Sequence, residues 1–242
     1  MKLVASDFDN TLAKNGWVTE ENRQAVAAYR RAGGLFGVVT GRSYYISHGI
    51  PADAGGLDFM ICCTGALIFD GEGKVLYHET APCDEMVADV ILKAQELGAN
   101  YFGVNYLREL YAPKMDEPLT VDFGTVTSFD HCNVRFPTPE IADQFVEYIE
   151  RTYPGRWRGF RNGICVDMPP YGCSKVDGIR RVAQLLGNGD VLVVGDNVND
   201  IPMLRAFPSC CVEAGVPLAK EAADSVTPSV AAMLTALLEQ EQ

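Results

Sequence analysis

Short, fully apolar segments separated by helical segments constrain this chain more than any other feature. In its first third, 3–8 is a short apolar run that ends in acids, 35–39 and 59–63 are apolar runs, and 19–32 has apolar positions at helical spacing. Later, β-branched 191–194 and apolar 209–212 enclose a helical segment. Strands that are apolar at every position are buried on both faces of a sheet. The pattern therefore predicts an α/β fold with a Rossmann-like, doubly wound parallel sheet.

The middle of the chain has a different organisation. The predicted elements there are helices over 84–97 and 140–153 and strands over 119–126, 132–136 and 164–168. Helices and strands grouped in this way indicate an α+β insertion with its own small sheet. Because Pro82 and Pro169 mark its two ends, we predict a core of 1–81 and 171–242 and a cap of 82–170.

Composition excludes several classes of partner. The net charge of −12 and the lack of any Lys or Arg run disfavour binding to nucleic acid or to anionic membranes. No apolar stretch reaches the roughly 20 residues of a membrane span. Of the eight cysteines, 62–63 and 210–211 are adjacent pairs in apolar runs, and no C-x-x-C spacing occurs, so we predict free thiols. We therefore expect a cytoplasmic protein, monomeric or a small homo-oligomer.

Polar residues follow three of the apolar strands directly. Asp7 and Asp9 flank Phe8, so an extended backbone directs both carboxylates to one side. Two acids follow the 191–194 strand, at 196 and 200, and Thr40-Gly41-Arg42 follows the 35–39 strand. Ligands of open parallel sheets gather at the carboxyl ends of the strands. Grouped carboxylates are unfavourable without a cation, and Mg²⁺ is the hard, oxygen-seeking ion that suits them.

Lys175 stands at the start of a helix predicted over 174–186, with Ser174 as its N-cap. A cation is unfavourable there because the N-terminal end of the helix dipole is positive. That position hints at a functional role, and a solvated surface lysine is the alternative.

Together these residues resemble the haloacid dehalogenase superfamily of phosphohydrolases, and within it the Cof-type sugar and cofactor phosphatases. The four signature motifs occur in order, as 7–12 (DFDNTL), 40–42 (TGR), Lys175 and 195–200 (GDNVND). The resemblance covers the predicted core, whereas the middle agrees only in size and position with a cap inserted between the second and third motifs.

The resemblance implies a Mg²⁺-dependent phosphatase of a small phosphorylated metabolite. Asp7 would be the nucleophile, and Asp9 the general acid for the leaving alcohol and then the base for water. An acid at position 9 favours phosphate ester cleavage, since dehalogenases of the superfamily have no alkoxide to protonate. Metal ligation would fall to Asp7, the Asp9 carbonyl and Asp196, with Asp200 binding directly or through water.

The implied phosphate-binding residues are Thr40, Gly41, Arg42, Lys175 and Asn199, with Lys175 also offsetting the repulsion between carboxylate and phosphate. Two departures from the family pattern stand out. Asn10 replaces the usual Gly, and because Asn tolerates positive φ we expect the turn to be kept. Thr64 stands where relatives have Asn, which affects contacts to the substrate rather than to the phosphate.

Specificity would lie in the cap, which would close over the site and exclude water. The candidate contacts are Arg108, Lys114, Arg135, Arg158, Arg161 and Asn162, with solvated surface charges as the alternative. The histidines, at 48, 78 and 131, show no ligand spacing and receive no role.

Two other functions stay open. A phosphomutase would hold the phosphoryl group on Asp7 longer before passing it on. A silent phosphate-binding regulatory module would keep the fold without turnover, although such a protein would be expected to lose at least one of the residues Asp7, Asp9, Lys175 or Asp196, and all four are present.

Overall fold

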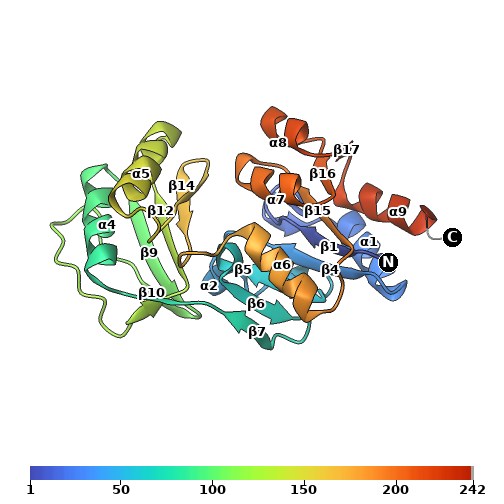
Figure 1. Ribbon diagram of the computed structural model, residues 1–242, viewed down its shortest axis with the longest axis horizontal. Coiled ribbons are helices and arrows are strands. Elements are labelled where there is room, and N and C mark those ends of the chain that lie inside the picture. The colour runs from blue at the N-terminus through green and yellow to red at the C-terminus, as the bar shows by residue number, and fades with distance from the viewer. Residues whose placement is uncertain (241–242) are drawn as a thin grey trace.

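The computed structural model describes residues 1–240 and contains two main sheets that lie next to each other along the long axis of the molecule (Figure 1). The larger sheet has eight strands in the order β17-β16-β15-β1-β4-β5-β6-β7. Its strands are β1 (Leu3–Ser6), β4 (Leu35–Val39), β5 (Phe59–Cys62), β6 (Leu67–Asp70), β7 (Val75–His78), β15 (Val191–Gly195), β16 (Ser209–Val212) and β17 (Ser225–Thr227).

The predicted α/β fold class is confirmed, with one difference at an edge of this sheet. The strands from β17 to β5 are parallel, whereas β6 and β7 are antiparallel to their neighbours. A short turn after β5 leads directly into β6, so the chain folds back without the helical crossover that a parallel strand would need.

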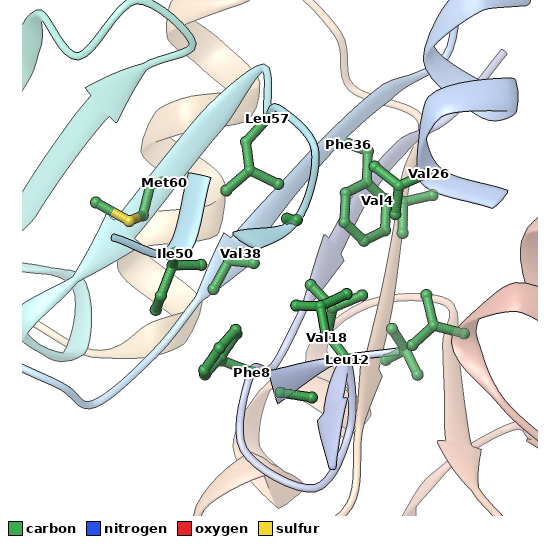
Figure 2. Packing of buried hydrophobic residues seen from close by; sticks show 14 of the residues in the cluster. Val4, Phe8, Leu12, Val18, Val26, Phe36, Val38, Ile50, Leu57 and Met60 are labelled. Carbon is green, nitrogen blue, oxygen red and sulfur yellow. The ribbon is translucent and has the colours of Figure 1, made fainter. Parts of the chain in front are cut away.

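Helices cover both faces of the larger sheet, and alternate residues of each strand pack against them. Val4 and Phe36 share a hydrophobic cluster with Val26 of α1 (Glu20–Arg31) and with α9 (Val230–Gln240). Leu3 and Ala5 face the other way, toward α6 (Lys175–Leu185) and α7 (Ile201–Ala206). Figure 2 shows the first cluster, in which Val4, Val26 and Phe36 lie together. This double burial is the reason why the strands are apolar throughout.

Loops and short elements at the carboxyl ends of these strands complete the larger unit. They are the hairpin of β2 (Ala13–Lys14) and β3 (Trp17–Val18), the helices α2 (Tyr44–Ser47), α3 (Ile50–Asp53) and α8 (Pro217–Ala222), and the turns η1 (Cys63–Gly65) and η2 (Val198–Asp200). Ser174 caps the start of α6 as predicted, because it accepts a hydrogen bond from Asp177 N, and Thr19 caps α1 in the same way by accepting from Asn22 N.

The smaller sheet is antiparallel, in the order β10-β9-β12-β14-β13, and the helices α4 and α5 pack on one of its faces (Figure 1). Its elements are α4 (Glu85–Glu96), β9 (Tyr101–Tyr106), β10 (Glu109–Tyr111), β12 (His131–Arg135), α5 (Pro139–Thr152), β13 (Phe160–Asn162) and β14 (Cys165–Met168), and β8 (Ala81–Pro82) pairs with β11 (Ser128–Phe129) beside it. The buried residues of this unit form their own cluster between 87 and 168, which supports the proposed cap of 82–170.

One predicted strand of the cap is wrong. The segment 119–126 forms no strand, although Leu119, Val121 and Phe123 alternate as a strand would. These side chains pack, partly buried, on the cap cluster, so burial of a loop explains the alternation. The strands β9, β10 and β13 were not predicted.

All eight cysteines are free thiols, as predicted. Among residues 1–240, no helix combines the length and the apolar character needed to cross a bilayer.

Candidate functional site

Three neighbouring strands of the larger sheet bring the predicted site residues together. Asp7 follows β1, Thr40 follows β4 and Asp196 follows β15, and these strands are adjacent in the order β15-β1-β4. The backbone continues the sheet pattern there, because Asp7 N donates to Val194 O at 2.9 Å. The three residues therefore lie at one edge of the sheet, as predicted from strand polarity.

Lys175 joins two of the acids. Its Nζ donates a hydrogen bond of 2.6 Å to Asp7 Oδ1 and another of 2.6 Å to Asp200 Oδ1. All three side chains are buried, with exposed fractions of 5%, 8% and 0% for Lys175, Asp7 and Asp200. The sequence could only rank a functional Lys175 beside a solvated surface lysine, and the structure excludes the surface alternative.

The acids outnumber the cation at this point. Carboxylate oxygens of Asp7, Asp196 and Asp200 lie within 4.8 Å of one another. Burial and the charge of Asp200 raise the pKa of Asp7 well above its usual range. The same two causes raise the pKa of Asp196 to about 6. Burial alone would lower the pKa of Lys175, but the carboxylates of Asp200 and Asp7 raise it overall.

The raised pKa values of Asp7 and Asp196 indicate whether a metal ion would suit the site. Three buried carboxylates carry more negative charge than one ammonium group compensates, so the ionised forms of these two acids are energetically unfavourable. A divalent cation would relieve that excess, and an all-oxygen donor set is the kind that Mg²⁺ prefers. The residues present therefore fit the predicted cofactor.

Asp200 is held on both of its oxygens. Oδ1 accepts from Lys175, and Oδ2 accepts from the backbone N of Asp196 at 3.0 Å and of Asn197 at 3.2 Å. A side chain at Gly195 would prevent this arrangement, since a Cβ there would lie 2.7 Å from Asp200 Oδ2. Asp200 thus fixes the loop that carries Asp196 and holds Lys175 in place.

Asp9 has a different environment from Asp7. Its carboxylate accepts two hydrogen bonds from the Arg42 guanidinium, from Nε at 2.9 Å and from Nη2 at 2.6 Å. Phe8 between the acids is buried in the core cluster (Figure 2), and both acids line one cavity, in agreement with the predicted alternation. Asn10 next to them adopts a φ of 59°, the conformation expected for a replaced glycine. Arg42 therefore contacts Asp9 here, and its predicted contact with phosphate stays a prediction.

A cavity of about 200 Å³ lies over the carboxyl ends of the strands, between the core and the cap. The core contributes Asp7, Asp9, Asn10, Thr40, Gly41, Arg42, Ser43, Ile46, Asp196, Asn197 and Asn199, and the cap contributes His131, Asn133, Asn162, Cys165 and Asp167. A small neighbouring pocket brings Lys175 and Thr64 beside Gly41 and Asn199. All the predicted catalytic, metal and phosphate residues except Asp200 thus line the cavity or the neighbouring pocket. Asp200 lies behind them and holds Lys175 and the loop of Asp196.

The cap side of the cavity was predicted poorly. Asn162 is the one candidate that lines it, and its Oδ1 accepts from Asn197 Nδ2 of the core at 3.2 Å. The other candidates lie elsewhere, Arg108 over the Tyr44 ring, Lys114 beside Glu117, Arg158 near Glu150, Arg161 beside Asp143, and Arg135 exposed. His131, to which the sequence gave no role, lines the cavity with Asn133, Cys165 and Asp167.

A sequence signal for these residues does exist. Asn133 in β12 stands between Cys132 and Val134, Asp167 in β14 stands between Val166 and Met168, and His131 lies two residues before Asn133. That period-two pattern marks one polar face of a half-buried sheet.

Comparison with known proteins places the chain in a family. A family model described as haloacid dehalogenase-like hydrolase matches residues 4–233. The chain belongs to this family.

Two Bacillus subtilis relatives and a solved structure support the assignment of this haloacid dehalogenase-like hydrolase. Phosphatase YwpJ is 34% identical over 115 residues, which span 47% of this chain and 40% of YwpJ, less than half of that protein. YkrA is 27% identical over 251 residues, 95% of this chain and 93% of its own length. The structure of BT4131 matches with a TM-score of 0.79 at 21% identity and covers 100% of this chain and 99% of its own, which shows the same fold. The predicted family and fold are thereby confirmed, and the relationship to named phosphatases supports the predicted enzyme class.

Proposed function

We propose that this haloacid dehalogenase-like hydrolase is a Mg²⁺-dependent phosphatase that removes phosphate from a small metabolite through a phospho-aspartate on Asp7. One observation carries the proposal. Lys175 holds the buried Asp7 and Asp200 through two hydrogen bonds of 2.6 Å, directly beside Asp196. Such an array compensates charge and positions a nucleophile, which is most of what phosphoryl transfer requires of a protein.

Asp7 would attack the phosphorus atom with a carboxylate oxygen while the bond to the leaving alcohol breaks. Lys175, close to that carboxylate, reduces its repulsion of the phosphate. Thr40 and Asn199, at the edge of the cavity, would donate hydrogen bonds to phosphoryl oxygens. Asp7, the Asp9 carbonyl and Asp196 would hold Mg²⁺, with Asp200 behind them, and the ion would supply charge neutralisation for the phosphoryl oxygens.

Asp9 would protonate the leaving oxygen and then take a proton from the water that hydrolyses the phospho-aspartate. Its two hydrogen bonds to Arg42 fix the plane of the carboxylate at the cavity wall. Arg42 would thus act as a positioning residue for the acid and base.

The remaining parts of the proposal concern the partner and the setting. BT4131 is described as a sugar phosphatase of subclass IIB, and we propose a sugar phosphate or a cofactor-like phosphate as the substrate class here too. We propose further a cytoplasmic protein, monomeric or a small homo-oligomer. The net charge of −12 supports the proposal that it binds neither nucleic acid nor anionic membranes.

The test is hydrolysis of p-nitrophenyl phosphate by the full chain. We expect Mg²⁺-dependent release of phosphate that is lost on chelation and in Asp7→Asn, and kept in the matched cap variant Asp116→Asn, whose side chain is exposed. Activity that survives both chelation and Asp7→Asn would refute the proposal. Release of phosphate without any bisphosphate activator would distinguish this enzyme from a phosphomutase.

A further inference from the structure

The cap sheet presents a polar face to the cavity. Side chains of β12 and β14 alternate, so Cys132, Val134, Val166 and Met168 are buried in the cap cluster with α4 and α5. The residues between them lie on the opposite face, where Asn133 pairs with Asp167 across the two strands. His131 and Cys165 belong to the same face, and all four line the cavity.

This polar face contains no Arg or Lys. Among its residues, His131, Asn133, Asn162, Cys165 and Asp167, the one carboxylate is that of Asp167. Among the residues that line the cavity, Arg42 of the core is the one Arg or Lys, and its Nε and Nη2 already donate to Asp9. A second phosphate or carboxylate on the substrate would therefore meet the Asp167 carboxylate without an Arg or Lys of the cap to offset the repulsion.

Asp167 lines the cavity where the cap meets the core. A Cβ built on Gly41 would lie 2.5 Å from Asp167 Oδ2, so this carboxylate is packed against the second signature motif. Its other oxygen, Oδ1, lies 3.2 Å from His131 Nε2. The carboxylate is thus placed beside the proposed phosphate site by a contact to the core and a hydrogen bond within the cap.

Buried polar atoms without a partner concentrate around this space. Of the four such side-chain atoms among the described residues, three belong to cavity or neighbouring pocket residues, namely His131 Nδ1, Thr64 Oγ1 and Asn199 Oδ1. His131 is only 1% exposed. Unsatisfied buried groups are costly and uncommon in folded proteins, and their grouping here fits a site whose hydrogen bonds are completed by a ligand.

Asn133 is oriented by its neighbour. Asn105 Nδ2 donates to Asn133 Oδ1 at 3.0 Å and to the His131 carbonyl at 3.2 Å. The amide oxygen of Asn133 is therefore engaged, and its position on the sheet is fixed from the β9 side.

We infer that Asp167, His131 and Asn133 form a subsite for hydroxyl groups of the leaving alcohol, and that it selects an uncharged, polyhydroxylated alcohol over one with a second anionic group. The inference rests on the proposed function and deepens it. A carboxylate, an imidazole and an amide offer both acceptors and donors, which suits hydroxyl groups because each hydroxyl donates and accepts. These residues determine specificity by touching the leaving group and take no part in the bond cleavage.

The experiment compares a glucose monophosphate with a glucose bisphosphate as substrates of the full chain. We expect the unaltered protein to prefer the monophosphate in kcat/KM. In Asp167→Asn, which keeps the shape but removes the charge, that preference should fall at least about tenfold, because hydrogen bonds to charged groups and repulsion of an anion are each worth about that factor. Asp116→Asn, the same change on an exposed cap position, should leave the preference within about twofold.

A second variant tests whether the imidazole of His131 binds the leaving group. His131→Phe keeps an aromatic ring but removes both nitrogens, and we expect it to lower kcat/KM for the glucose monophosphate more than for p-nitrophenyl phosphate, whose aryl group has no hydroxyl to bind. Equal losses for the two substrates would overturn the role given to His131, as would a preference for the bisphosphate in the unaltered protein.

Binding separates this inference from the proposed function. In the Asp7→Asn background, calorimetric titration with each glucose phosphate should show tighter binding of the monophosphate, and Asp167→Asn should remove the difference. If the unaltered protein hydrolyses no ester but this binding preference appears and responds to Asp167→Asn, the proposed function fails and the subsite stands. A preference unchanged by Asp167→Asn, in kinetics or in binding, would overturn the subsite.

Discussion

The core half and the cap half of the cavity are built in opposite ways. The core half consists of buried charges on loops after parallel strands, where Lys175 ties Asp7 to Asp200. The cap half is one face of an antiparallel sheet, mostly uncharged, with Asp167 as its single carboxylate. Charged groups that hold one another fix the geometry of the reaction, whereas the side chains of the cap face stand on a sheet whose backbone hydrogen bonds do not depend on them. The difference implies that chemistry and selection can be altered separately.

The largest expected effect comes from the core half. Lys175→Met should lower kcat for p-nitrophenyl phosphate by about 10³-fold, because it removes the charge that offsets carboxylate and phosphate repulsion. It should also lower the free energy of unfolding by about 3 kcal/mol at neutral pH, since it leaves Asp7 and Asp200 buried without their cation. Steady-state kinetics and urea denaturation check the two effects.

The matched control is Lys114→Met, since that lysine is exposed and pairs only with Glu117. It should change neither quantity measurably. If Lys175→Met behaved like this control, the core half would not depend on its ion pairs, and the contrast between the two halves would be lost.

The connection between the halves gives the next effect. Asp130 of the cap is fully buried; its Oδ2 accepts from Leu107 N at 2.7 Å and lies 3.0 Å from His78 Nε2 of the core, while its Oδ1 accepts from Cys63 Sγ. Asp130→Ala should lower the free energy of unfolding by about 2 to 3 kcal/mol, because it leaves the Leu107 amide without an acceptor. Urea denaturation measures this loss.

Asp130→Asn provides the graded comparison. It keeps one acceptor oxygen and should cost less than the alanine variant. A loss as small as that of an exposed substitution such as Asp116→Asn would show that this buried carboxylate does not hold cap and core together.

A smaller change within the core half concerns orientation rather than charge. Arg42→Lys keeps the positive charge but cannot make both hydrogen bonds to Asp9 in one plane. We expect kcat to fall about tenfold, as for a general acid held less well, with KM for p-nitrophenyl phosphate little changed. A rise in KM with unchanged kcat would instead indicate that Arg42 binds the phosphate, as the family resemblance implied.

The two halves also differed in how well the sequence predicted them. The apolar strands before Asp7, Thr40 and Asp196 are buried on both faces, so their pattern is continuous and their polar ends are conspicuous. The contact of Arg42 with Asp9 could not be predicted, because it joins loops that become neighbours only when β1 and β4 pair.

In the cap, charge was a misleading guide. Arg161 and Lys114 were chosen as candidates because they are cations, but they bind surface acids. His131 and Asp167 occupy alternate positions on strands whose order in the sheet is β12-β14, and that order cannot be derived from one sequence. The antiparallel strands β6 and β7, at one end of the larger sheet, were missed for a related reason, since a tight turn after β5 carries no periodic signal.

The smallest expected effect tests the charge excess of the core half directly. The pKa of Asp196 is raised to about 6 by burial and by Asp200, whereas an unfolded chain releases such protons near about pH 4. Between these values the folded protein holds a proton on Asp196 that the unfolded protein has lost. This residue therefore makes the free energy of unfolding fall as pH rises to about 6, and no further above it.

Mg²⁺ would offset the repulsion between the ionised acids and should raise Tm more at about pH 7.5 than at about pH 5. Thermal denaturation with and without Mg²⁺ measures this, and Asp196→Asn should reduce the difference between the two pH values. An equal rise in Tm at both pH values would mean that the ion does not compensate these carboxylates, and the core half would then be no more dependent on charge than the cap.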